Sequence, residues 1–274
     1  MTEQPRFPFA EHLSPQLLKS PWWIGHIPFA FELVARLRPR TIVELGTYSG
    51  SSFAAFCQAV EACGLDAKCY GIDLWEGDVH MGRLEEDVYR DVSAYMASIY
   101  PTIATLLRKD FTEAAALFAD GSVDLLHIDG THTREAVSND FRTWLPKMSD
   151  AGVVLFHDIN VTIANTGPSA RKFGVRHVFD RVKRPYPHFE FSHCWGLGVL
   201  VVGTHAPPPV MELVELARDQ AFSDYFASKG ALVSRRFEAM GVSLPSHRAY
   251  SSTTPPWRRA IGALRRVGER LLRP

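Results

Sequence analysis

One short segment constrains the fold of this chain more than any other. Residues 41–52 read TIVELGTYSGSS, so an apolar, β-branched run leads to Glu44, and two glycines follow just before a helical stretch. Gly46 and Gly50 allow a tight turn and leave room for a ligand close to the backbone. The following helix offers unpaired amides and a partial positive charge at its start. The segment therefore predicts a strand, a turn and a helix of an α/β protein, with a ligand at the turn.

A second acidic residue ends the next apolar run, at Asp73. A ribose can donate two hydroxyl hydrogen bonds to a carboxylate in this position, which suggests an adenosine cofactor. A dinucleotide fingerprint requires Gly-x-Gly-x-x-Gly against a pyrophosphate. This chain has only Gly46-x-x-x-Gly50, so the glycine spacing does not favour a dinucleotide.

The looser turn after Glu44 resembles motif I of class I S-adenosylmethionine-dependent methyltransferases. In that motif the acid faces the cationic amino acid end of the cofactor. The resemblance implies that Glu44 and the residues of the turn contact S-adenosylmethionine, namely Gly46, Thr47, Tyr48, Gly50 and Ser51. An ordinary strand-to-helix connection stays open as the alternative, because isolated glycine motifs have many false positives.

Composition limits the other function classes. The 274 residues are 46% hydrophobic and can bury one large core. Residues 257–274 hold six of the 30 basic and one of the 30 acidic residues, which leaves 24 basic and 29 acidic residues elsewhere. This mildly acidic body gives no electrostatic reason to bind nucleic acid. We therefore expect no nucleic-acid partner.

The cysteines and the apolar runs indicate a compartment. The four cysteines lack the paired spacing of a zinc site and do not suggest a disulfide framework, so a reduced compartment fits. The chain starts without a basic segment followed by an apolar run, and no stretch is long enough to span a bilayer. We expect a soluble, cytoplasmic protein with no transmembrane segment.

Strand-like and helical runs alternate along the chain. The strand-like runs are 41–46, 68–73, 103–107, 123–129 and 152–157, and the helical stretches lie near 51–63, 83–98, 112–118 and 133–145. Near-continuous apolar strands suit a parallel sheet with helices on both faces. A polar loop at 160–170, a helix at 171–184 and two strands at 189–191 and 198–202 follow. The prediction is an α/β, Rossmann-like, seven-stranded and mostly parallel sheet with a closing antiparallel hairpin, which resembles the methyltransferase architecture.

Changes in composition divide the chain. We expect an N-terminal helical lead at 1–40 packed on the core, a class I methyltransferase domain at 41–204 and C-terminal helices at 205–243, near 211–228 and 230–240. A Ser/Thr/Pro linker at 244–256 leads to a basic amphipathic tail helix at 257–274. That helix could rest on an anionic membrane surface or a partner protein, or it could be a solvated terminal helix.

Polar residues follow two apolar strands that should be neighbours. Asp129 ends one and Asp158 follows the other, and the carboxyl ends of parallel strands meet at one ligand crevice. Two carboxylates repel each other unless a proton or a cation lies between them, and Mg²⁺ or Mn²⁺ suits oxygen ligands. His132 lies close enough to act as the general base. The alternative is that Asp129 and Thr131 cap a helix and His132 is exposed.

These residues belong to a longer resemblance. The run LHIDGTHTREAV at 126–137, WLP at 144–146 and GVVLFHD at 152–158 resemble the class I methyltransferase family 24, and the similarity spans roughly residues 22–203. Similar domains act on sugar hydroxyls of macrolides or accompany glycosyltransferases. The resemblance implies an O-methyltransferase for a sugar, a polysaccharide or a glycosylated natural product, with magnesium or another divalent ion at the site.

The resemblance also implies individual roles. Asp129 and Asp158 match the metal carboxylates, Asp129 also lies in the cofactor site, and His132 matches the base. The related enzymes carry an acid where this chain has His157, which becomes a third candidate ligand or a hydrogen-bonding group for the substrate.

Further cofactor contacts are implied at Leu74 and Trp75, after Asp73, and at Asp110 and Phe111, which match the adenine position. Trp75 could equally belong to the core, and Asp110 could equally cap the next helix.

Two other function classes stay open. The wider family also resembles a cephalosporin hydroxylase component, so an oxidative enzyme is one alternative, and a product that gains oxygen rather than a methyl group would identify it. A non-catalytic module that partners a glycosyltransferase is the other. A homo-oligomer is also compatible with the sequence.

Overall fold

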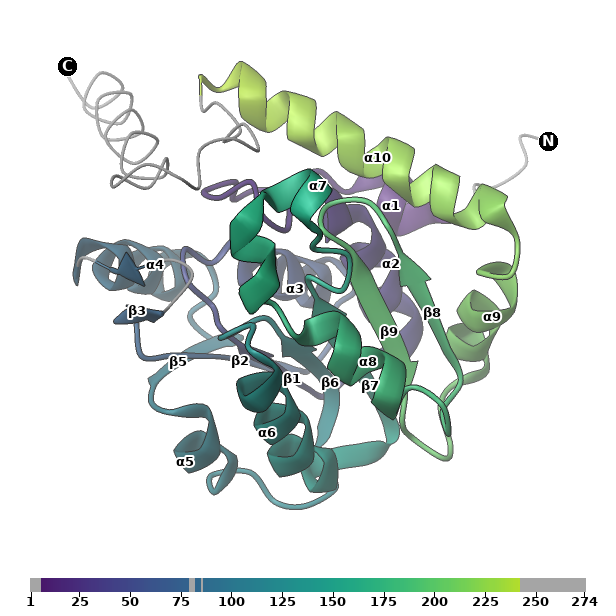
Figure 1. The fold of residues 1–274 in the computed structure, drawn as a ribbon, viewed down its shortest axis with the longest axis horizontal. Helices are drawn as coiled ribbons and strands as arrows, with labels where there is room; N and C mark the ends of the chain where they lie inside the picture. Colours follow the sequence, from purple (N-terminus) through teal and green to yellow (C-terminus); the bar gives the residue numbers. More distant parts are fainter. Residues whose placement is uncertain (1–5, 79–81, 85, 242–274) are drawn as a thin grey trace.

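A seven-stranded sheet runs through the centre of the protein (Figure 1). The computed structural model describes residues 6–78, 82–84 and 86–241. The strand order is β5-β2-β1-β6-β7-β9-β8. The strands are β1 (Thr41–Leu45), β2 (Lys68–Asp73), β5 (Ala104–Arg108), β6 (Val123–Ile128), β7 (Met148–His157), β8 (His188–Phe191) and β9 (Leu197–Val201). Among the described strands of this sheet, β9 pairs antiparallel with β7 and with β8 and the other pairs are parallel, so the predicted Rossmann-like sheet with a closing hairpin is confirmed.

Helices cover both faces of this sheet and bury two apolar cores (Figure 1). The first face carries α2 (Ile27–Leu37), α3 (Ser51–Ala62) and α4 (Glu86–Ile99). The second face carries α5 (Phe111–Ala115), α6 (Arg134–Trp144) and α8 (Val175–Val182). A separate two-stranded ribbon, β3 (Gly77–Asp78) with β4 (Gly82–Arg83), precedes α4.

Alternation along the central strands decides which polar side chains share a face. Ile42 of β1 packs in the first core and Val43 in the second, so Glu44 points to the same face as Ile42. His127 of β6 and His157 of β7 follow Leu125 and Leu155 of the first core by the same rule. Three buried polar groups therefore lie on the face that α2 and α3 cover.

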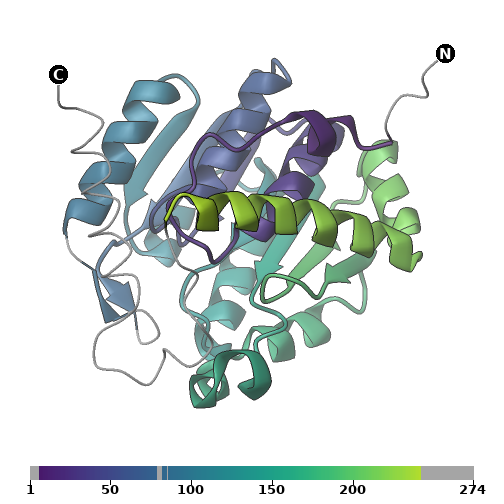
Figure 2. The same cartoon turned by 90° about the horizontal axis from the view of Figure 1, so that it is seen from above.

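The two ends of the described chain meet on that face. The N-terminal part forms α1 (Pro8–His12) and η1 (Ile24–His26), and the C-terminal part forms α9 (Pro208–Leu216) and α10 (Gln220–Ala239). The helix α10 lies across η1 and α2, as Figure 2 shows from above. One apolar core includes residues from Phe7 to Phe237, so both ends pack on the sheet.

The predicted division of the C-terminal helices is wrong. The helices break at 217–219 and not near 229, because Asp219 caps α10 with its side chain, which accepts a hydrogen bond from Ala221 N. Gly230 lies inside α10. A Cβ at this position would lie 2.1 Å from Gly25 O, so the glycine permits a close approach to η1 and does not end the helix.

Other boundaries also shift. The predicted loop at 160–170 contains the short helices α7 (Ile163–Thr166) and η3 (Pro168–Lys172), and Thr162 caps α7 with a capping box. The strand β7 begins at Met148, four residues before the predicted run. The division into lead, domain and C-terminal helices stays a prediction. The predicted linker at 244–256 and tail helix at 257–274 lie outside the described residues.

Across the part of the chain that the structure describes, none of the helices combines the length and apolar character that crossing a membrane requires.

Candidate functional site

A cavity of about 340 Å³ opens at the carboxyl ends of the central strands. The end of β1 is bonded to both neighbouring strands there, because Gly46 N donates to Ile72 O of β2 (2.9 Å) and Asp129 N, just after β6, donates to Leu45 O (2.9 Å). Gly46 has φ +94°, and a Cβ on it would lie 2.1 Å from Asp129 O. Only glycine fits this contact.

Most of the predicted site residues line this cavity: Gly46, Thr47, Tyr48, Ser51, Asp73, Leu74, Asp110, Phe111, Asp129, His132, His157 and Asp158. Glu44, Gly50 and Trp75 do not line it. We call the part formed by residues 46–49, 51, 73–74, 109–112 and 139–140 the β2 half. The part formed by Asp129, His132, His157, Asp158, Trp22 and Trp195 is the β7 half.

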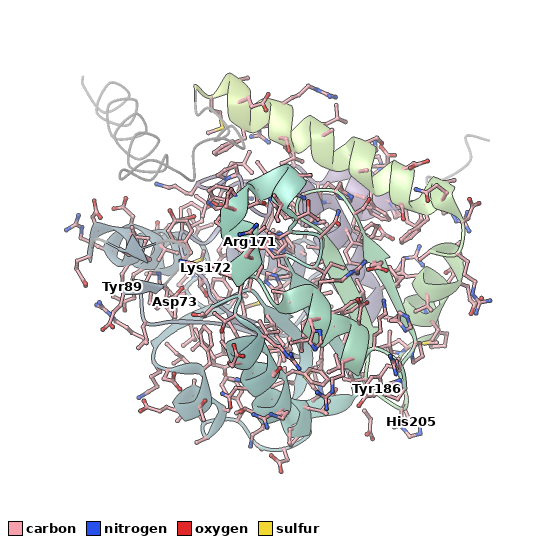
Figure 3. All side chains as sticks on the ribbon, in the orientation of Figure 1. Asp73, Tyr89, Arg171, Lys172, Tyr186 and His205 are labelled. Atoms are coloured by element: carbon pink, nitrogen blue, oxygen red, sulfur yellow. The ribbon has the colours of Figure 1, made fainter. Side chains whose placement is uncertain are left out.

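Asp73 is the fixed acid of the β2 half. Its Oδ2 accepts a hydrogen bond from Tyr48 N (2.9 Å) and its Oδ1 accepts one from Trp75 N (2.7 Å). Trp75 is buried and donates from Nε1 to Tyr48 O (2.8 Å), so it also fixes the turn after β1. Figure 3 labels Asp73 well away from Tyr186 and His205, which lie at the opposite edge of the molecule. Each carboxylate oxygen can still accept from a ligand hydroxyl.

In the described part of the chain, two unpartnered hydroxyl groups line the same half of the cavity as Asp73. Within the described residues, Thr47 Oγ1 and Ser49 Oγ are buried and have no hydrogen-bond partner, and both residues line the cavity. Ser51 Oγ instead accepts from Lys19 N and Ser20 N, which ties the N-terminal segment to α3. Because buried polar groups normally have partners, the two hydroxyls fit a polar ligand beside Asp73.

Asp110 is a helix cap, as one of the two interpretations of the sequence held. Its Oδ1 accepts from Thr112 N (2.8 Å) and Glu113 N (3.3 Å) at the start of α5. The residue also lines the cavity beside Phe111, so its capping role and a ligand contact are compatible.

Two carboxylates and two imidazoles converge in the β7 half. His132 Nε2 lies 3.2 Å from Asp129 Oδ1 and 3.1 Å from Asp158 Oδ2. His157 Nδ1 lies 3.0 Å from the same oxygen of Asp129. The alternative with an exposed His132 is wrong: its side chain is 15% exposed, and Thr133 caps α6 by accepting from Ala136 N. The ring of Phe173 stacks on His132 with centroids 5.0 Å apart.

These groups shift one another's protonation. Although burial opposes it, His157 and His132 lower the pKa of Asp129 well below its usual range. Burial raises the pKa of Asp158, and the two imidazoles offset only part of that rise. Burial would lower the pKa of both histidines, but the carboxylates of Asp129 and Asp158 raise them, that of His157 strongly. The cluster therefore favours an ionised Asp129 beside a cationic His157.

Glu44 and His127 form a buried pair outside the cavity lining. Glu44 Oε2 and His127 Nδ1 are 2.9 Å apart, and both side chains are fully buried. They stand opposite each other on β1 and β6. Burial raises the pKa of Glu44, although the bond to His127 acts in the other direction. The sequence analysis did not identify His127, and only its place on the face of Glu44 could have indicated the pair.

Two distant segments form the wall of the β7 half. The rings of Trp22 and Trp195 are 5.4 Å apart, edge to face. Cys194 O accepts from His26 Nε2 (3.2 Å) and from His157 Nε2 (3.1 Å). Cys194 and Trp195 have φ values of +49° and +62°, a strained conformation for such side chains. No local sequence pattern indicates Trp22 as part of this wall.

A divalent cation fits part of the predicted ligand set. Asp129, His132 and Asp158 each offer a ligand atom, and these atoms lie within 4.8 Å of one another. His157 fits less well as a ligand, because both of its nitrogens face acceptors, Asp129 Oδ1 and Cys194 O. A ligating imidazole needs a free lone pair. The arrangement thus favours His132 over His157 as the nitrogen ligand.

Comparisons with known proteins agree with this geometry. Residues 43–159 match a family model described as a methyltransferase domain. The chain is 40% identical over 224 residues to the uncharacterized protein y4gI of Sinorhizobium fredii (strain NBRC 101917 / NGR234), which covers 80% of this chain and 24% of the relative. The chain therefore spans about a quarter of that relative's length.

Solved structures share the fold. The S-adenosylhomocysteine-bound methyltransferase PaMTH1 of Podospora anserina has a TM-score of 0.50 at 13% identity, over 72% of this chain and 82% of that one. A protein of Staphylococcus aureus assigned as a caffeoyl-CoA O-methyltransferase has a TM-score of 0.50 at 16% identity, over 64% and 81%. At these identities the similarity extends to the fold alone.

Proposed function

We propose that the protein transfers the methyl group of S-adenosylmethionine to a hydroxyl group, because residues 43–159 match a family model described as a methyltransferase domain. The acceptor class that we propose is a sugar, a polysaccharide or a glycosylated natural product. One observation carries the proposal: a single cavity joins the oriented carboxylate of Asp73 to the cluster of Asp129, His132 and Asp158.

The β2 half is suited to hold the adenosine and the amino acid end of the cofactor. Asp73, held by two backbone amides, can accept from both ribose hydroxyls. Thr47 and Ser49 supply the unpartnered hydroxyls nearby. Bound S-adenosylmethionine supplies a methyl group on a positively charged sulfur.

In the β7 half, His132 accepts the proton of the substrate hydroxyl. The imidazolium that forms is stabilised by Asp129 and Asp158, whose oxygens lie 3.2 and 3.1 Å from Nε2. Most of the rate enhancement comes from holding the oxygen in line with the methyl group and the sulfur, and the proton transfer adds to it.

A divalent ion is a proposed addition. Asp129 and Asp158 would hold it, and it would supply a positive charge beside the substrate oxygen. His132 Nε2 cannot ligate the ion and accept the substrate proton at once, so in this proposal it stays the proton acceptor. His157 lies behind these groups and neutralises Asp129 without the ion.

The wall of the β7 half is suited to contact a ring-shaped acceptor. Trp22 and Trp195 line the cavity beside the carboxylate cluster. An indole face offers a large apolar surface to the C–H face of a sugar ring, and the nearby carboxylates can accept from its hydroxyls.

Calorimetric titration with S-adenosylhomocysteine tests the cofactor assignment. We expect saturable binding in roughly the micromolar range, lost in Asp73→Ala and kept in Asp66→Ala, a matched change at an exposed position. Thermal unfolding of each variant shows whether it is folded. A folded wild-type protein that binds no S-adenosylhomocysteine would contradict the proposal.

An acceptor screen completes the test. Sugars and glycosylated small molecules are incubated with S-adenosylmethionine, and the product mass is measured. A product that gains a methyl group supports the proposal, whereas a product that gains an oxygen atom would assign the protein to oxidative chemistry.

A further inference from the structure

Asp140 is a buried carboxyl group in the β2 half for which the proposed reaction has no use. It lies on α6, is 5% exposed and lines the cavity beside Asn139. Its Oδ2 is buried and has no hydrogen-bond partner among the described residues. An unpartnered buried polar atom costs about 1–3 kcal/mol, so a position that keeps one on a cavity wall indicates a contact with a ligand.

The place of Asp140 identifies which part of a ligand it faces. The turn before α5 brings Asp110, Phe111 and Thr112 to the same wall, and Asn139 Nδ2 donates to Thr112 Oγ1 (3.1 Å). That turn follows β5, the edge strand next to β2, whereas Asp158 follows β7 on the other side of the sheet centre. With the reacting methyl group at Asp129 and the ribose at Asp73, the base of the cofactor lies at this end.

Asp110 supplies only part of what a base requires. Its Oδ1 is occupied by two amides of α5, and an ionised carboxylate accepts but does not donate. The edge of adenine presents an amino group that donates beside a ring nitrogen that accepts. A partner that both donates and accepts is therefore needed.

Near neutral pH, Asp140 can both donate and accept a hydrogen bond. Burial, with a contribution from the negative charge of Asp110, raises the pKa of Asp140 to about 7. The other charged groups on this half are Asp73 and Lys109. A protonated carboxyl group carries one O–H donor and one carbonyl acceptor side by side, which matches the adenine edge.

We propose that Asp140, as a neutral carboxyl group, recognises the adenine of the cofactor by donating to a ring nitrogen and accepting from the exocyclic amino group. This inference rests on the proposed function and extends it to base specificity. At the edge where the ring nitrogen is N7, a base with oxygen in place of that amino group, such as hypoxanthine, offers two acceptors where one acceptor and one donor are needed.

The test compares two probes, S-adenosylhomocysteine and S-inosylhomocysteine, by calorimetry at pH 6. We expect the wild-type protein to favour the adenosine compound about 10- to 100-fold, the range expected for a mismatched hydrogen bond. Asp140→Leu should reduce the preference to within about threefold, and Asp140→Asn, which keeps a donor and an acceptor, should retain it. Glu135→Gln, at an exposed position of the same helix, is the control.

The pH dependence gives a second readout. Only the protonated form of Asp140 can donate, so wild-type affinity for S-adenosylhomocysteine should fall about tenfold from pH 6 to pH 8. Asp140→Asn should lose that dependence.

Two failures are distinguishable. If the folded wild-type protein binds neither probe, the proposed function fails, and this inference fails with it. If it binds S-adenosylhomocysteine but Asp140→Leu keeps the wild-type preference, the inference alone is overturned. Thermal unfolding confirms that both Asp140 variants are folded.

Discussion

The two halves of the cavity are built in different ways. In the β2 half, the contacts that fix Asp73 and Asp110 join residues at most 25 positions apart: Asp73 is held by Tyr48 N and Trp75 N, and Asp110 is held by the first amides of α5. In the β7 half, Cys194 O accepts from His26, 168 residues earlier in the sequence. Binding groups can thus be oriented locally, whereas the proposed reaction centre depends on the whole tertiary structure.

The halves also differ in charge. The β7 half places two carboxylates and two imidazoles within hydrogen-bonding distance of one another. The β2 half presents hydroxyls and separate acids, one of which, Asp140, is buried and has an oxygen, Oδ2, with no hydrogen-bond partner in the described part of the chain. A change in the β7 half should therefore affect the reaction, and a change in the β2 half should affect ligand affinity or stability.

The largest expected effect belongs to the β7 half. His132→Ala removes the proton acceptor and should lower turnover about 10²- to 10⁴-fold, while affinity for S-adenosylhomocysteine changes less than about threefold. Steady-state kinetics and calorimetry measure the two quantities. His177→Ala, at an exposed position, is the control, and equal loss of turnover and affinity in His132→Ala would remove the distinction between the halves.

Gly46→Ala should damage both halves at once. The new Cβ would stand 2.1 Å from Asp129 O at a φ of +94°, so the turn after β1 must move away from the turn after β6. We expect a loss of about 2–3 kcal/mol in the free energy of unfolding, together with weaker binding of S-adenosylhomocysteine. Denaturant titration checks this, and Gly64→Ala, also at positive φ but with open space around it, separates the clash from the backbone strain. Equal losses in both variants would show that the contact is unimportant.

Asp140→Asn should raise stability at alkaline pH. The folded-state pKa of about 7 lies above the value of 3.8 for the free side chain, so the unfolded chain loses this proton first as pH rises. Stability is therefore lost from pH 3.8 to about pH 7 and stays lower above it. The pKa shift corresponds to a loss of about 4 kcal/mol in the free energy of unfolding once Asp140 is ionised. The amide in Asp140→Asn does not ionise but leaves buried groups unpaired, so the variant should regain about 2 kcal/mol of this loss.

Thermal unfolding of Asp140→Asn and wild type at pH 4 and pH 8 measures this difference. The variant should gain stability at pH 8 and little at pH 4. A gain that is the same at both values would mean that the ionisation of Asp140 is not its cause.

The smallest effect concerns the wall of the β7 half. Trp22→Ala should raise the KM for the acceptor about 5- to 10-fold by removing one indole face, with cofactor affinity unchanged. Kinetics with the acceptor from the screen measure it. A parallel loss of S-adenosylhomocysteine affinity would place Trp22 in the cofactor site instead.

The sequence was informative where structure is local. Near-continuous apolar strands such as 123–128 predicted the parallel sheet, and the rule for strand ends brought Asp129 and Asp158 together. Trp22 and Cys194 could not be linked in this way, because only the packing of the N-terminal segment against the connection between β8 and β9 makes them neighbours. Asp140 carried a weak signal, as an acid on the apolar stripe of Val137, Phe141 and Trp144.

Gly230 shows the opposite error. In sequence a glycine indicates a helix end, but here it lies within α10 because Gly25 approaches too closely for any side chain. Propensity was overridden by packing.

That contact between Gly25 and Gly230 has a consequence for recombining this protein with its relatives. The helix α10 bears directly on η1, which carries His26, and His26 shares the carbonyl of Cys194 with His157. A chimera that exchanges only residues 43–159 would place the end of β7 from a relative against the η1 and α10 of this protein. A chimera should therefore take the segments 20–26 and 220–239 from the same parent protein as the residues of the active-site cluster.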